Sequence, residues 1–142
     1  MPGSPIAQLA LALVVGVCVL AWWKGGAAER FGAALFFINI FFFIGVGYIA
    51  PPSMMPVLLL VDDAVTAMGL LFVTLRFGSL WLGGAMLLYA AQFTLHSFYF
   101  VTERQPDAFH AIVNNAIFVG VVICLGVGTA MSIRRRQAAR RE

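Results

Sequence analysis

The sequence predicts an all-α integral membrane protein, a bundle of five transmembrane helices with its N-terminus outside and its C-terminus inside. Composition supports this first: 62% of the residues are hydrophobic, 11% are charged, and the mean hydropathy is +0.96, whereas an average soluble domain carries about 25% charged residues. The chain also contains five apolar runs, each near the roughly 20 residues that cross a bilayer. Basic residues are distributed unevenly between these runs. We therefore expect a protein of the plasma (inner) membrane of a bacterium.

The first two predicted spans cover residues 5–23 and 31–50. The first ends on two tryptophans and Lys24, which is typical of an aromatic belt followed by an interfacial cation. No Lys or Arg precedes this run, so we expect a retained membrane helix rather than a signal peptide. After the linker KGGAAER, the second run has one polar side chain near its middle, Asn39, which we expect to hydrogen-bond to a neighbouring helix.

The remaining three spans are predicted over residues 56–76, 80–101 and 109–133. The prolines of APPSMMP separate the second span from the third, because proline removes backbone donors and interrupts a helix. Only three residues separate the third span from the fourth, which predicts a tight antiparallel hairpin. The whole of residues 1–133 is then one transmembrane domain, and residues 134–142 form a basic cytoplasmic tail.

Positive charge sets the predicted orientation. Five spans place one basic residue, Arg104, outside and the other eight inside, as the positive-inside rule requires. The inside residues are Lys24, Arg30, Arg76, Arg134, Arg135, Arg136, Arg140 and Arg141. Since five of the nine basic residues lie in the tail, the net charge of +3 indicates membrane orientation and contact with lipid headgroups rather than nucleic-acid binding.

Two adjacent carboxylates, Asp62 and Asp63, interrupt the third span. A carboxylate in the hydrocarbon region costs about 2.5 to 3.5 kcal/mol on insertion scales, so it normally faces a bundle interior or water and indicates a functional site. Asp62 lies 14 residues before Arg76, which places it about 21 Å from the inner face at 1.5 Å per residue. The same count along the fourth helix puts Gln92 level with it and His96 one turn higher.

On the fifth span, Asn114 lies 20 residues before Arg134, so Asn114 and Asn115 fall near the outer boundary, and His110 lies one turn above Asn114, about a turn or two above His96. Polar residues of three helices thus fall in the outer half of the membrane. We predict an outward-facing pocket built by the third, fourth and fifth spans, in which the carboxylates accept hydrogen bonds from amides or from a protonated histidine. Its predicted members are Asp62, Asp63, Thr66, Gln92, His96, Tyr99, His110, Asn114 and Asn115. The two cysteines each lie alone in an apolar run, and no metal site or cofactor is expected.

These residues favour a small membrane subunit that binds or conducts a proton, an ion or a small polar solute. A structural or assembly subunit, or a holin-like protein with no site, is the first alternative, because Asn, Gln and His also join membrane helices by hydrogen bonds. A lipid-modifying membrane enzyme is the second, with an aspartate and His96 as acid and base. No recognisable catalytic motif supports an enzyme. Expected partners are membrane lipids and a second copy or a larger membrane complex.

Overall fold

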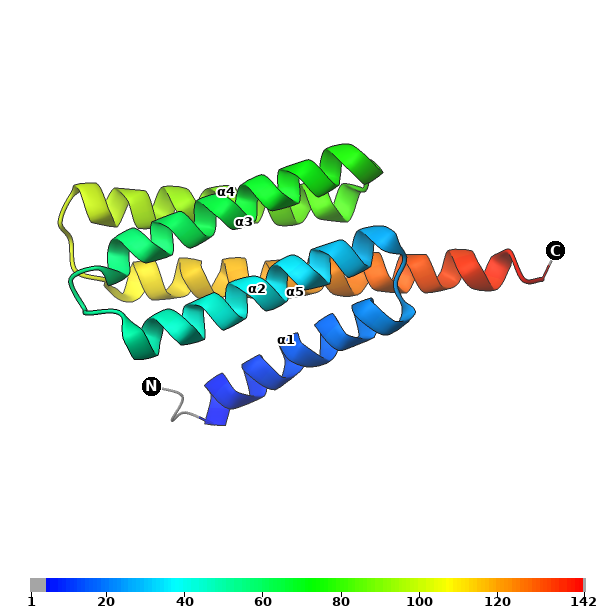
Figure 1. The fold of residues 1–142 in the computed structure, drawn as a ribbon, viewed down its shortest axis with the longest axis horizontal. Coiled ribbons are helices and arrows are strands. Elements are labelled where there is room, and N and C mark those ends of the chain that lie inside the picture. Colours follow the sequence, from blue (N-terminus) through cyan, green and yellow to red (C-terminus); the bar gives the residue numbers. More distant parts are fainter. Residues whose placement is uncertain (1–4, 142) are drawn as a thin grey trace.

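The computed structural model describes residues 5–141, which form five α-helices and no strand (Figure 1). The helices are α1 (Pro5–Lys24), α2 (Ala27–Ile49), α3 (Met55–Phe77), α4 (Leu80–Val101) and α5 (Ala108–Ala138). The all-helical prediction is therefore confirmed. Residues 1–4 of the predicted domain and residue 142 of the predicted tail lie outside the described residues.

Two helix ends differ from the prediction by more than one residue. Helix α2 begins at Ala27, inside the predicted linker, because the Glu29 carboxylate accepts a hydrogen bond from the N-cap amide of Gly26 at 2.8 Å. Such a contact satisfies an amide that has no partner within the helix. Helix α5 continues to Ala138, so the first part of the predicted tail is helical. Arginine suits this last turn because it lies at the negative end of the helix dipole.

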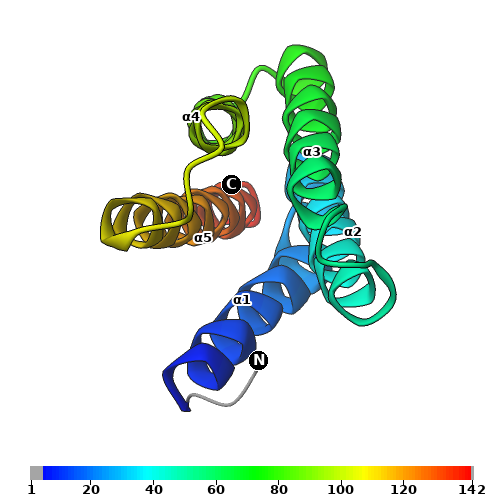
Figure 2. The same ribbon diagram turned by 90° about the vertical axis from the view of Figure 1, so that its left-hand side faces the viewer.

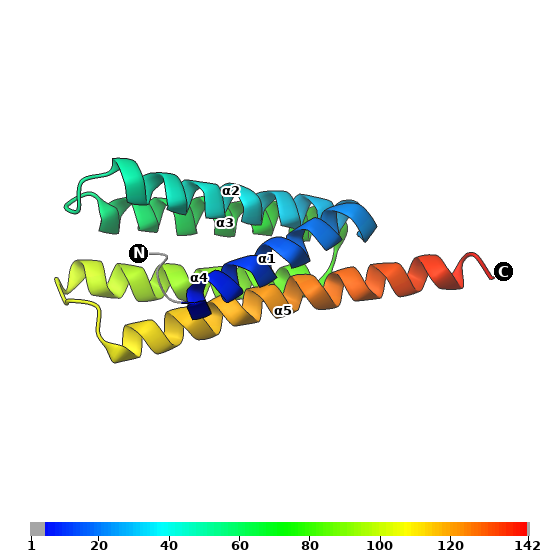
Figure 3. The same cartoon turned by 90° about the horizontal axis from the view of Figure 1, so that it is seen from below.

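The five helices form a closed ring in chain order. Each helix packs against the next, α1 also contacts α5, and α2 contacts α5 across the ring. Figure 2, which looks along the bundle, shows α4, α3, α2, α1 and α5 following one another around this ring. Figure 3 shows that α5 runs past the end of the other helices toward the C-terminus. The hairpin between α3 and α4 turns at Gly78, whose φ of 61° lies in the left-handed region that favours glycine.

Trp81, in the first turn of α4, packs between α2 and α5. A Cβ atom built on Gly128 would lie 2.5 Å from the Trp81 ring, and one on Gly32 would lie 2.6 Å from it. These two glycines therefore make room for the indole. Around them the core consists of aliphatic side chains that are almost fully buried, among them Leu70, Leu82 and Leu125.

The outer surface of the bundle is apolar. Many large hydrophobic side chains are exposed on every helix, with Leu80 at 93% and Ile49 at 86%. Soluble monomers rarely expose large contiguous apolar patches, whereas lipid covers such a surface in a membrane. Helices α2, α3 and α5 are each long and apolar enough to cross a bilayer. The described apolar part of α1, Leu11–Lys24, is shorter, and the polar residues of α4, including Gln92 and His96, lower its hydropathy.

Candidate functional site

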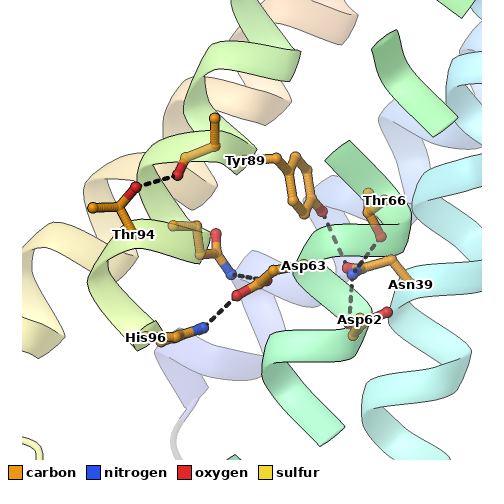
Figure 4. A network of polar contacts seen from close by, with 9 residues as sticks. Asn39, Asp62, Asp63, Thr66, Tyr89, Thr94 and His96 are labelled. Carbon is orange, nitrogen blue, oxygen red and sulfur yellow. Dashed lines mark hydrogen bonds and ion pairs between the residues drawn. The ribbon is translucent and has the colours of Figure 1, made fainter. Parts of the chain in front are cut away.

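Polar side chains from α2, α3 and α4 meet in the interior of the bundle (Figure 4). We call this group the polar cluster. Its members are Asn39, Asp62, Asp63, Thr66, Tyr89, Gln92 and His96. The two adjacent aspartates point to different helices, so the cluster has two halves. One half joins α3 to α4, and the other joins α3 to α2 and, through Tyr89, to α4.

Asp63 is the centre of the first half. Its side chain is 3% exposed, and each of its oxygens has a partner on α4. The Gln92 amide donates to Oδ1 at 3.2 Å, and His96 Nδ1 lies 2.5 Å from Oδ2. Gln92 and His96 are four residues apart and therefore lie on one face of α4. The short hairpin sets the antiparallel register that brings this face opposite Asp63.

Asn39 is the centre of the second half. Its Nδ2 donates to Asp62 Oδ2 at 2.6 Å and to Thr66 Oγ1 at 3.3 Å, and its Oδ1 accepts the Tyr89 hydroxyl at 3.1 Å. Asp62 and Thr66 lie one turn apart on α3, so a single amide reaches both. The side chain of Asn39 therefore links three helices. Sequence reasoning anticipated an interhelical bond from this residue but did not assign it, or Tyr89, to the site.

A second group lies at the end of the bundle where α4 passes to α5, and we call it the Asp107 cluster. The Tyr99 hydroxyl donates to Asp107 Oδ1 at 2.6 Å, and the His110 backbone N–H donates to the same oxygen at 2.9 Å. Arg104 lies 3.5 Å from the other Asp107 oxygen. The bond from Tyr99, followed by the bond from the backbone amide, holds the pKa of Asp107 below its usual range.

The Asp107 cluster is joined to the polar cluster by a pair of histidines. The imidazole rings of His96 and His110 are stacked with their centroids 5.3 Å apart, and Tyr99 meets the His110 ring edge-on at 4.8 Å. Helix α5 thus reaches the site through its first turn. Counting along the helices placed His110 a turn or more above His96, whereas packing of α5 against α4 brings the two rings into contact.

The asparagine pair of α5 is not part of this arrangement. Asn114 is half-buried and Asn115 is exposed, and within residues 5–141 neither side chain hydrogen-bonds to the polar cluster. The prediction that the third, fourth and fifth helices build the site also omitted α2, which supplies Asn39. Asp63 and Thr66 are buried, and every buried side-chain nitrogen or oxygen in the described chain has a hydrogen-bond partner. These groups are bonded to one another rather than lining an open pocket.

A third polar group, the Glu29 cluster, lies at the opposite end of the bundle. Glu29 is 8% exposed and accepts the Trp81 indole N–H at 3.2 Å. The turn between α1 and α2 also binds α5, because Gly26 N–H lies 3.0 Å from Ser132 Oγ and Arg136 donates to Gly25 O at 3.0 Å. Sequence reasoning placed Glu29 in a linker. Its position three residues after Gly26 is the signal that was available.

The site is suited to hydrogen bonding and proton exchange. Within the part of the chain that the structure describes, no three His, Cys, Asp or Glu side chains converge as metal ligands, and Cys18 and Cys124 are free thiols. The Asp63 and His96 pair unites a carboxylate with the side chain whose ordinary pKa lies nearest neutrality. Comparison of the chain with protein-family models, with curated proteins and with solved structures finds no match.

Proposed function

We propose that the chain is a five-span membrane protein, N-terminus out and C-terminus in, whose polar cluster binds or conducts a proton, an ion or a small polar solute from the outer side. One observation carries this proposal. A carboxylate, Asp63, is buried inside a bundle with an apolar exterior and lies 2.5 Å from the ring of His96. Intramembrane ionisable residues that pair with one another commonly mark ion pathways and proton relays.

The helix lengths support five spans. The shortest helix, α1, has 20 residues, and α4 has 22, which correspond to about 30 and 33 Å at 1.5 Å per residue. In the ring, α1 packs against α2 and α5, and α4 packs against α3 and α5 (Figure 1). Lipid covering the ring would surround all five helices. The basic residues at the Glu29 end of the bundle then lie on the cytoplasmic side.

Cysteine labelling tests this topology. In a variant with both native cysteines replaced by alanine, Glu103→Cys reports on the turn between α4 and α5, and Arg140→Cys reports on the tail. We expect an impermeant maleimide to label the first from outside in intact cells and the second only after lysis. Labelling of both positions from the same side would contradict five spans in this orientation.

Flux measurement tests the function. We expect proteoliposomes containing the wild-type protein to show a pH-dependent flux that Asp63→Asn abolishes and Asn115→Ala leaves unchanged. Asn115 is an exposed amide on α5, so this variant controls for insertion and reconstitution. A wild-type protein that inserts correctly and conducts nothing would count against conduction. Proton binding is tested separately by titration of the histidines.

A structural or assembly role is the second candidate, and the Asn39 half of the cluster favours it. Asn39 joins α2, α3 and α4 through three hydrogen bonds, which is how polar groups hold membrane helices together. This candidate predicts that the protein co-purifies as an oligomer or with a larger membrane complex, and that Asn39→Ala disrupts the assembly. A monomer after cross-linking in native membranes would contradict it.

A further inference from the structure

The stacked histidines lie between the buried carboxylate and the surface. Exposure of the side chains rises along this path, from 3% at Asp63 and 11% at His96 to 41% at Asp107. His110 is only partly buried, and its ring contacts the rings of both His96 and Tyr99. The path therefore leads from Asp63 through two imidazoles to the end of the bundle where the Asp107 cluster lies.

The hydrogen bond to Asp63 defines what His96 can accept. A neutral imidazole has one donor and one acceptor nitrogen, and Nδ1 lies 2.5 Å from the Asp63 carboxylate. With Nδ1–H donated to that carboxylate, Nε2 is the atom that takes a proton. Asp63 then balances the charge of the imidazolium.

The charges around the two rings favour one protonated, cationic ring rather than two. Asp63 is the carboxylate that contacts His96, whereas Asp62 is directed to Asn39 on α2. Asp107, near His110, is already bound by Tyr99 and paired with Arg104. Two imidazolium rings with centroids 5.3 Å apart would repel each other.

We infer that the ion taken by this site is the proton, and that His96 and His110 share a single proton above Asp63, with His110 exchanging it with water on the outer side. A proton from water binds a ring nitrogen of His110 or Nε2 of His96, and its charge disfavours protonation of the other ring. The inference rests on the proposed function, because it names the ion for the same site. A metal cation is disfavoured because both Asp63 oxygens already accept hydrogen bonds and the described residues supply no three-ligand group.

Histidine titration in lipid nanodiscs tests the shared proton. With ¹⁵N-labelled imidazoles, we expect the two wild-type rings to titrate in separate, coupled steps. His110→Gln should move the His96 midpoint to higher pH because it removes a competing cation, and His96→Gln should have the reciprocal effect on His110. His110→Phe keeps an aromatic ring in the stack without a charge. It should produce the same shift, whereas a purely packing role for His110 predicts the wild-type midpoint.

Several results would overturn the inference. These are independent titration of the two rings, an unchanged His96 midpoint in both His110 variants, or a shift of the His96 signals on adding Na⁺ at constant pH. The Asn115→Ala variant should titrate as the wild type does. Coupled titration without flux would refute conduction and retain the shared proton. Flux with uncoupled histidines would refute the shared proton and retain the proposed function.

Discussion

Asn39→Ala is the sharpest test of how the bundle is held together. The substitution removes three interhelical hydrogen bonds, one to a carboxylate, one to the Thr66 hydroxyl and one from the Tyr89 hydroxyl. Interhelical hydrogen bonds in membrane proteins average about 0.6 kcal/mol each and reach about 1.7 kcal/mol. We therefore expect the free energy of unfolding to fall by about 2 kcal/mol. The loss should be larger if the half-buried Asp62 is left without a donor, because an unsatisfied group carries the desolvation penalty.

The assay is reversible unfolding in bicelles by steric trapping, with a double-mutant cycle. Tyr89→Phe removes one of the three bonds and keeps the ring stacked on Phe36. The cycle should therefore return a coupling energy between positions 39 and 89 of about 0.6 kcal/mol or more. Asn115→Ala, at an exposed amide with no bond to the cluster, should stay within about 0.5 kcal/mol of the wild type. A loss for Asn39→Ala no larger than that of this control would refute the reasoning.

Three further predictions use the same unfolding measurement. Gly128→Ala should destabilise the protein by about 1 to 3 kcal/mol, because its Cβ would lie 2.5 Å from Trp81. A Cβ on Gly126 would have nothing within 4 Å, so Gly126→Ala should be neutral or stabilising. Equal effects of the two substitutions would contradict this packing. Trp81→Phe should cost about 1 to 3 kcal/mol because the buried Glu29 loses its indole donor, and a neutral result would mean that the bond does not form. Since the folded-state pKa of Asp107 is lowered from 3.8, its contribution to stability is present above that value and is lost as pH falls through the folded pKa. Asp107→Asn should remove this part of the acid sensitivity, and an unchanged acid profile would contradict the assignment.

Much of the helical framework followed from composition and periodicity. The bounds of α4 were predicted as the structure has them, because Arg76 and the short FGS segment mark the hairpin clearly. That hairpin also allowed residues of α3 and α4 to be matched by counting. The level placement of Gln92 with the aspartates agrees with its hydrogen bond to Asp63. Local sequence determined this register because few residues lie between the two helices.

Contacts between helices distant in the chain could not be obtained in this way. Nothing in the sequence states which helix lies beside which, or how far each is rotated, so the partners of Asn39 on α3 and α4 appeared only in the fold. The same holds for the contact of His110 with His96, which depends on how α5 packs against α4. Asn115 is the converse case, because counting along the helix predicted it as a member of the site, whereas in the fold it is exposed and makes no bond to the cluster.

The sequence alone determined that this protein is an apolar helical bundle with two carboxylates inside one helix. The length and hydropathy of each helix, and the position of the hairpin, depend on residues that are neighbours in the chain. Tertiary structure decided what those carboxylates bind. Asp62 and Asp63 are adjacent in the chain, but the helical twist directs one to Asn39 on α2 and the other to His96 on α4. The order of helices in the ring then separates two sites, which are the junction of three helices at Asn39 and the pair formed by Asp63 and His96. Only the carboxylate and histidine pair meets the histidine of α5, and it continues toward the end of the bundle where α4 passes to α5.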